Sequence, residues 1–372
     1  MVRLPDSSTD PLPIRHFEQM LDYDYLTTSY KLYWFLGVFK EILDGNQVIN
    51  FRRVAIRMLA ASWYSIIQFK LNFGKMDMLA NLATYIHQTY SIASDIKEND
   101  LIDFINLLHD KRVDSSIDRL TNYVPYRLLT PFFNQELARQ RDSLKNGMIC
   151  ELSSKTDTAF YKVFKDDKLI AVNDAWMNYV SQNQNIIFGW LNYKLIYYLQ
   201  KKNPNVPAIP FKIRPPYKRD LIEAGKFWKD IIEETHITDV YTDLQFNSDN
   251  MASFGGISVD HFLPWSFVLH DEIWNLVPTF KSVNSSKGNR LPQLDSFLNR
   301  FCEVQYLAVT TYTRRKHTKL LEDYWTLNNA FTEGRQTPIS KDVFISSLKK
   351  TISPLYQIAY NQGFEIWPGI SN

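Results

Sequence analysis

The segment 257–287 restricts the fold of this chain more than any other part of the sequence. Residues 257–260 alternate apolar and polar side chains, as a short strand does. Residues 274–277 form a second apolar run, closed by Pro278, and the residues at 284–286 are of the types that cap the start of a helix. We therefore expect the order strand, loop, strand, helix, which would bring the polar residues of the segment together.

Five polar side chains in this segment suit metal-assisted cutting of a phosphodiester. Asp260 directly precedes His261, Asn275 follows fourteen positions after the histidine, Asn284 comes nine positions later, and Lys287 three after that. Phosphodiester hydrolysis needs a deprotonated water and positive charge on the phosphate. A neutral imidazole accepts a proton near pH 7. Carboxylate and amide oxygens are the ligands that Mg²⁺ and Mn²⁺ prefer.

Over about 255–300 the segment resembles the HNH nuclease motif, the ββα-metal fold. The resemblance implies that His261 is the general base, that Asp260 and Asn284 bind one Mg²⁺ or Mn²⁺ ion, and that Asn275 stabilises the loop. The spacings are similar to those of the HNH domain in RNA-guided CRISPR effector nucleases, which has Asn in the third position and a Lys three residues on. Lys287 matches that Lys; contact with phosphate and an ordinary helix-surface position both remain open for it.

This resemblance implies a metal-dependent DNA endonuclease that nicks one strand per site. Free-standing bacterial HNH proteins, which the segment also resembles, serve in restriction and anti-phage defence, so we expect that role. One alternative is an HNH subunit that cuts only within a larger complex, for example an RNA-guided or ATPase-containing one. Another is a non-catalytic nucleic-acid-binding protein with a vestigial site. A protein partner or a homodimer is compatible with each.

A second histidine and the two cysteines say less about function. His270 lies in the loop between the expected strands, where a solvated position or a contact with substrate or metal are both open. Cys150 and Cys302 are far apart in the sequence, so they form neither a disulfide framework nor a zinc knuckle.

Charge predicts where nucleic acid would bind. The chain has a net charge of only +2, so binding to a polyanion requires a local basic cluster. Residues 281–319 hold eight basic and two acidic side chains. A solvated helix face is one interpretation, but directly after a nuclease motif we favour phosphate contacts. The residues assigned to DNA binding are Lys281, Arg290, Arg314, Arg315 and Lys316.

We predict a mainly α-helical fold with an embedded small α+β domain. Apolar residues recur at helical spacing over 32–43 and 51–67, with Asn50 as an N-cap, and further helices are expected near 76–92, 99–110, 218–234, 296–327 and 340–360. A β-hairpin is expected at 161–172, and Asp174 is expected to cap a long helix through about 200. Pro-dense residues 203–216 predict a linker or a wrapping loop.

The expected domains are a helical docking or DNA-positioning domain at 1–120, a mixed α/β region at 121–245, the HNH domain at 246–330 and a C-terminal helical segment at 331–372. The start of the chain lacks an apolar signal core, and no run reaches the ~18 apolar residues that a membrane helix needs. The sequence therefore predicts a cytoplasmic protein with no membrane partner.

Overall fold

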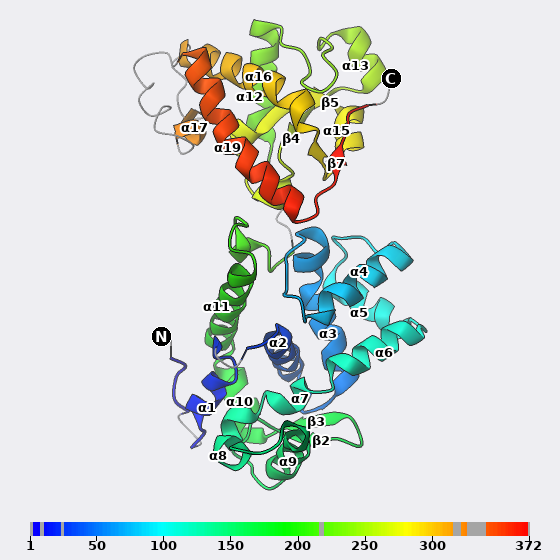
Figure 1. The fold of residues 1–372 in the computed structure, drawn as a ribbon, viewed down its shortest axis with the longest axis vertical. Coiled ribbons are helices and arrows are strands. Elements are labelled where there is room, and N and C mark those ends of the chain that lie inside the picture. The colour runs from blue at the N-terminus through cyan, green and yellow to red at the C-terminus, as the bar shows by residue number, and fades with distance from the viewer. Residues whose placement is uncertain are drawn as a thin grey trace. The chain divides into compact units, whose positions relative to one another are not determined.

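The computed structural model describes residues 3–7, 11–23, 26–215, 219–314, 321–325 and 340–370 (Figure 1). The chain forms two compact units. The first is Met1–Pro204 with Ile209–Pro215, and the second is Asn205–Ala208 with Pro216–Asn372. The division lies within the Pro-dense segment. The predicted domain limit at 120 falls inside the first unit, and the limit at 245 falls inside the second. Residues on both sides of the predicted limit at 330 belong to the same hydrophobic core.

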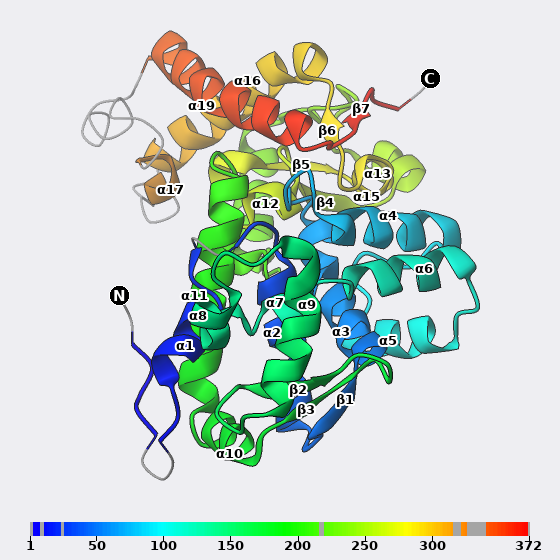
Figure 2. The ribbon, with the colours of Figure 1, turned by 60° about the horizontal axis from the view of Figure 1, so that its bottom comes forward.

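The first unit is mostly helical. Its elements are α1 (Ile14–Gln19), α2 (Tyr30–Leu43), β1 (Val48–Asn50), α3 (Phe51–Trp63), η2 (Tyr64–Gln68), α4 (Met78–Tyr90), α5 (Glu98–Leu107), α6 (Lys111–Leu120), α7 (Val124–Arg127), η3 (Thr130–Phe133), α8 (Asn134–Leu137), α9 (Asp142–Ser154), β2 (Tyr161–Phe164), β3 (Leu169–Val172), α10 (Asp174–Gln182), α11 (Gln184–Lys202) and η4 (Ile209–Phe211). Within this unit α2 packs against α3, α10 and α11 (Figure 2).

Side-chain caps begin several of these helices, including α3 and α4. Asn50 accepts a hydrogen bond from the backbone N–H of Arg52, which confirms the predicted cap of α3. Asp77 caps α4 through Leu79 and also accepts hydrogen bonds from the backbone N–H and the hydroxyl of Ser29. Asp77 therefore ties the start of α4 to the start of α2.

The predicted hairpin is present, but it belongs to a larger sheet. β2 and β3 pair antiparallel, with Val163 opposite Ile170, and β1 adds a third strand on the other side of β3. β1 has only three residues, too few for an alternating pattern to identify. Aromatic residues contribute to the core of this unit; Phe17 stacks on Trp176 at 4.7 Å between ring centroids.

The single long helix expected from Asp174 is wrong in two respects. The chain forms α10 and α11, separated at Asn183, and the N-cap of α10 is Asn173. Asn183 leaves the helical conformation, and its side-chain amide donates to the carbonyl of Tyr179. A short polar side chain that competes for backbone groups in this way interrupts a helix.

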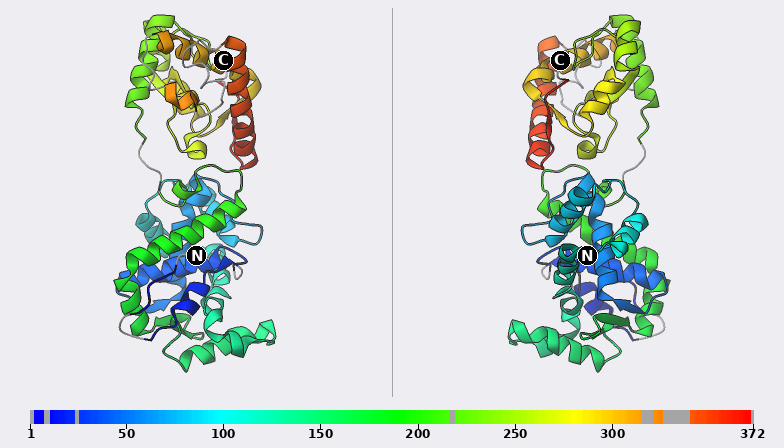
Figure 3. Two further views of the ribbon diagram at one scale, coloured as in Figure 1. Left: turned by 90° about the vertical axis from the view of Figure 1, so that its left-hand side faces the viewer. Right: turned by 90° about the vertical axis from the view of Figure 1, so that its right-hand side faces the viewer.

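The second unit surrounds a two-stranded sheet with helices. Its elements are α12 (Ile222–Thr235), α13 (Ser248–Phe254), β4 (Ile257–His261), α14 (Trp265–Val268), η5 (Ile273–Asn275), β5 (Leu276–Phe280), α15 (Lys281–Lys287), β6 (Leu291–Pro292), α16 (Leu294–Arg314), α17 (Glu322–Trp325), α19 (Lys341–Asn361) and β7 (Ile366–Trp367). Figure 3 shows the yellow strands of this unit between the green α12 and the red α19. α12 contacts both β4 and β5, α16 contacts β5, and α19 packs on α16.

A continuous apolar core fixes this sheet. Leu276 and Val277 of β5 are closed to solvent, and Phe262, just after β4, stacks on Phe301 of α16 at 4.1 Å between ring centroids. The molecule is thus mostly helical with small sheets, as predicted. In the part of the chain that the structure describes, no helix combines the length and apolarity needed to cross a membrane.

Candidate active site

β4 and β5 pair antiparallel and place the Asp-His pair at the end of the sheet. Asp260 lies opposite Val277, and His261 lies opposite Leu276. The first strand is as predicted. The second was predicted to close at Pro278, and that is wrong, because Pro278 lies inside β5 opposite Val259. The sheet has two strands, so Pro278 sits on an edge strand, where a missing N–H is tolerated.

The helix that follows begins earlier than predicted. α15 starts at Lys281, directly after the extended residue Phe280, so Asn284 lies in the middle of the helix and is not its N-cap. The side chain of Asn284 instead bonds to β4. Its Nδ2 donates to Ser258 Oγ at 2.8 Å and to the Val259 carbonyl at 3.2 Å. The helix therefore packs against the strand that carries Asp260, and Asn284 Oδ1 accepts no hydrogen bond from any described residue.

Asp260 is buried, with 4% of its surface exposed, and each carboxylate oxygen has a partner. Tyr241 donates its hydroxyl to Oδ2 at 2.6 Å, and Lys287 Nζ lies 3.2 Å from Oδ1 and 3.0 Å from Oδ2. Burial and the neighbouring carboxylate raise the pKa of Tyr241 well above its ordinary value, so this hydroxyl keeps its proton. Sequence reasoning missed Tyr241, since nothing marks a tyrosine nineteen positions upstream as a partner.

Lys287 is almost fully buried, with 1% of its surface exposed, so a helix-surface position is wrong for it. Besides the ion pair with Asp260, its ammonium donates to the His261 carbonyl at 2.7 Å. Burial lowers the pKa of Lys287, and the charge of Asp260 opposes that effect. Lys287 thus joins the end of α15 to the end of β4.

His261 is also buried, at 3% exposed. Its Nε2 lies 2.7 Å from Oδ1 of Asp271, a residue of the loop between the strands. Among the described residues, Nδ1 of His261 has no hydrogen-bond partner. Sequence reasoning missed Asp271 as well; the available signal was a carboxylate in the loop after the histidine. The adjacent His270 packs its ring against Trp274, with 5.1 Å between centroids, and accepts a long backbone hydrogen bond from Glu272.

Asn275 spans the loop that follows the histidine. Its Oδ1 accepts from the Leu263 N–H at 2.8 Å, and its Nδ2 donates to the Leu263 carbonyl at 2.9 Å. Its own carbonyl accepts from the Phe262 N–H. Fully buried, this amide satisfies backbone groups that would otherwise be unpaired, and it fixes the chain directly after His261.

A buried carboxylate outside the predicted set holds the segment that carries Tyr241. Asp239 accepts from the Tyr241 and Thr242 N–H groups through Oδ1, and from Thr279 Oγ1 and the Phe280 N–H through Oδ2. Burial raises the pKa of Asp239. These bonds connect the residues before α13 to the end of β5, and this connection places Tyr241 beside Asp260.

The residues assigned to DNA binding differ in their surroundings. Lys281 is exposed at the start of α15 and makes no ion pair within the described residues. Arg290 donates to the Ser286 and Lys287 carbonyls, which caps the end of α15. Arg314, exposed, donates to Thr310 and Thr311 of its own helix. Arg315 and Lys316 lie outside the described residues.

The donor set fits a hard divalent cation. Asp260 on β4 supplies a carboxylate. Asn284 on α15, which packs against β4, supplies an amide oxygen that has no hydrogen-bond partner in the described structure. Such ions keep several water ligands, so two protein ligands are sufficient. Over the described ranges no group of three or more His, Cys, Asp or Glu side chains is placed to hold a metal ion.

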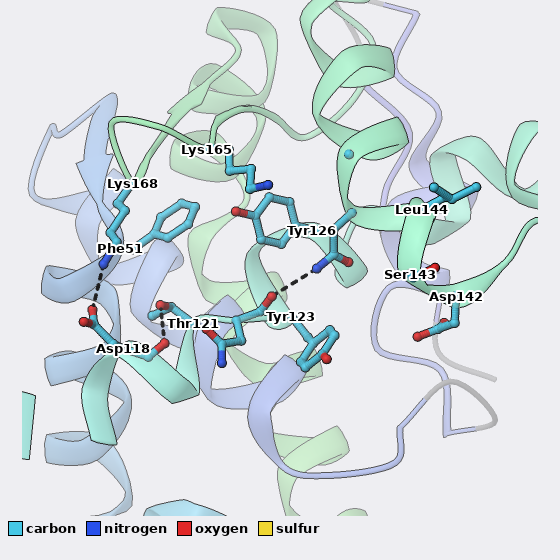
Figure 4. A pocket seen from close by; sticks show the side chains of 13 residues that line it. Phe51, Asp118, Thr121, Tyr123, Tyr126, Asp142, Ser143, Leu144, Lys165 and Lys168 are labelled. Carbon is cyan, nitrogen blue, oxygen red and sulfur yellow. Dashed lines mark hydrogen bonds and ion pairs between the residues drawn. The ribbon is translucent and has the colours of Figure 1, made fainter. Parts of the chain in front are cut away.

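The first unit contains a separate pocket of about 770 Å³ between α6, α9 and the β2–β3 turn (Figure 4). Its lining includes the rings of Phe51 and Tyr126. Its acidic side chains are paired, Asp118 with Lys168 of the turn and Asp142 with Arg127. The described residues that line it include no histidine. The site residues that the sequence predicts lie outside this pocket, in the second unit.

Comparison with known proteins agrees with this placement. Residues 239–293 match a family model described as HNH endonuclease. No curated protein and no solved structure matches the chain. The matched range begins at Asp239 and contains Asp260, His261, Asn275 and Asn284. The segment 239–293 of the second unit is therefore identified as an HNH endonuclease domain.

Proposed function

We propose that this chain is a metal-dependent endonuclease that hydrolyses phosphodiester bonds in DNA. One observation carries the proposal. Within the matched domain, β4, β5 and α15 place the His261 imidazole next to the Asp260 carboxylate and the Asn284 amide. Among the described residues, neither His261 Nδ1 nor Asn284 Oδ1 has a hydrogen-bond partner. These are the groups that phosphodiester hydrolysis needs.

His261 is the proposed base. A neutral imidazole bonded through Nε2 offers its Nδ1 lone pair to a water molecule, and removal of a proton from that water generates the nucleophile. The backbone on either side of His261 is fixed, because Lys287 binds its carbonyl and Asn275 binds the chain two residues later. Asn275 thus acts by holding the base in place.

Asp260 and Asn284 are the residues that would hold one Mg²⁺ or Mn²⁺ ion. When bound, such an ion supplies positive charge to the phosphate and stabilises the departing oxygen. Tyr241 and Lys287 fix the carboxylate of Asp260 in one orientation. Because Lys287 is buried, we assign it to positioning Asp260 and the end of β4, in place of direct contact with phosphate.

The proposed DNA contacts come from basic residues around this site. Lys281 is exposed at the start of α15, the helix that carries Asn284. Arg290, Arg314, Arg315 and Lys316 extend the basic cluster along the sequence. With one such site per chain, we propose that a single chain nicks one strand.

A role in bacterial restriction or anti-phage defence is part of the proposal and rests on the likeness to free-standing HNH proteins. Activity only within a larger complex is the alternative. Across 29–92, all of which is described, the exposed large apolar side chains are Leu43, Val48 and Met76, so few apolar residues there are available for docking. This observation favours an HNH protein that cuts on its own. The intact set of site residues likewise favours activity over a vestigial site.

Plasmid cleavage tests the proposed function. Purified full-length chain is incubated with supercoiled DNA and Mg²⁺, Mn²⁺ or EDTA, and His261→Asn protein is the control for a contaminating nuclease. We expect cutting with either ion and none with EDTA or the variant. A wild-type chain that leaves DNA intact with both ions would refute an autonomous nuclease.

A further inference from the structure

The loop between β4 and β5 brings a carboxylate to the ring nitrogen of His261 that the proposed base does not use. Asp271 Oδ1 lies 2.7 Å from Nε2, and the Asp271 side chain is 28% exposed. An ionised carboxylate only accepts hydrogen bonds, so the neutral imidazole must carry its proton on Nε2. The lone pair is then on Nδ1.

Contacts from outside the matched family range hold this loop. The backbone N–H of Ile273 donates to Asp323 Oδ2 of α17 at 2.8 Å. Gln305 of α16 donates to the carbonyls of Ile273 and Leu276, at 3.2 and 2.7 Å, and Tyr324 of α17 donates to Gln305 Oε1. Residues 305, 323 and 324 lie beyond the match to the HNH model, which ends at 293. Helices beyond the matched range therefore hold the backbone that begins two residues after Asp271.

We propose that Asp271 is a positioning residue for His261, holding the imidazole in the tautomer that leaves Nδ1 free to accept a proton, and that α16 and α17 hold Asp271 for this purpose. The proposal rests on the proposed function for its catalytic meaning. The tautomer itself is a property of the folded protein and can be measured without DNA or metal.

The experiment is nitrogen NMR on full-length protein labelled with ¹⁵N histidine, at a pH where the ring is neutral, with His261→Asn protein to assign the signal. We expect wild-type His261 to carry its proton on Nε2. Asp271→Ala should give a mixture of tautomers, because the acceptor is gone. Glu272→Gln is the matched control: it removes the same charge from the same loop, retains an acceptor for Trp274, and should leave the spectrum unchanged.

Cleavage kinetics complete the test. Asp271→Ala should lower kcat about tenfold to a hundredfold with an unchanged KM for DNA. Asp271→Asn should recover part of that loss, since its amide oxygen still accepts from Nε2. A wild-type His261 protonated on Nδ1, or an Asp271→Ala protein with a pure Nε2–H tautomer and wild-type kcat, would overturn the proposal. If wild-type protein does not cut DNA, the proposed function fails, and the tautomer measurement still decides the role of Asp271.

Discussion

Lys287 and Asp260 form an ion pair inside the second unit, with Lys287 Nζ 3.0 Å from Asp260 Oδ2 and both side chains closed to solvent. The pair joins the last residue of α15 to β4 next to the proposed base. Each of the two charges stabilises the other, because burying either charge without its partner would cost free energy. The first prediction follows from that dependence.

Lys287→Met should destabilise the protein strongly, by about 3–5 kcal/mol, because it leaves the Asp260 charge buried without its partner. The double variant Lys287→Met, Asp260→Asn should lose less than the sum of the two single variants, since no unpaired charge remains. Urea unfolding of the four proteins measures this coupling. Additive losses would show that the pair contributes no interaction energy.

His261→Asn should reduce DNA cutting by about 10² to 10⁴ fold, because it removes the general base. Asparagine fills part of the space of the buried ring, so we expect the variant to remain folded. Single-turnover cleavage and thermal unfolding are measured on the same preparation. Wild-type cutting rates in the folded variant would exclude His261 as the base.

Asn284→Ala should weaken metal binding as well as activity, because it deletes a proposed ligand while Asp260 and Lys287 keep their ion pair. Ser282, exposed on the same helix, supplies the matched control Ser282→Ala. Calorimetric titration with Mn²⁺ measures the affinity, and Mg²⁺ or Mn²⁺ should support activity better than Zn²⁺. Equal Mn²⁺ affinity in wild-type and Asn284→Ala proteins would refute the ligand assignment.

Asp77 should make the stability of the first unit depend on pH. Burial raises the pKa of this carboxyl from 3.8 to about 6, against the hydrogen bonds from Ser29 and Leu79. The folded state then binds its proton more tightly than the unfolded state, so stability falls as pH rises through the interval between those two values. From pH 5 to pH 8 the contribution should fall by about 1–2 kcal/mol. Urea unfolding of wild-type and Asp77→Asn proteins at pH 5 and pH 8 isolates the contribution of Asp77. If the difference in free energy of unfolding between the two proteins is the same at both pH values, the prediction is wrong.

Supercoiled plasmid should pass to open circle before linear DNA appears, because one site on one chain cuts one strand. Linear product should rise with protein concentration, as second cuts accumulate or two chains act together. Gel analysis of a time course at several concentrations measures both products. Prompt linear DNA at concentrations where the protein sediments as a monomer would show that the argument is wrong.

Local sequence determined the elements that carry the candidate site and the order in which they occur. Alternation over 257–260 predicts β4, because side chains on a strand point to opposite faces in turn. Asn50 predicts the start of α3 for an equally local reason, since a cap bonds within its own first turn. At Asn284 the local rule for N-caps failed because of a tertiary contact. Asn284 has the side chain of an N-cap, but it donates to β4.

Only the tertiary structure decided which groups surround the two central side chains. Tyr241 reaches Asp260 because Asp239 ties its segment to the end of β5. Asp271 reaches His261 because α16 and α17 hold the loop from more than thirty positions away. Periodicity reports which face of an element is buried, but it carries no information about which distant element covers that face. The proposed base and ligands could therefore be identified from the local sequence alone. Their hydrogen-bond partners and the burial of Lys287 depend on the packing of the whole unit, which the local sequence does not specify.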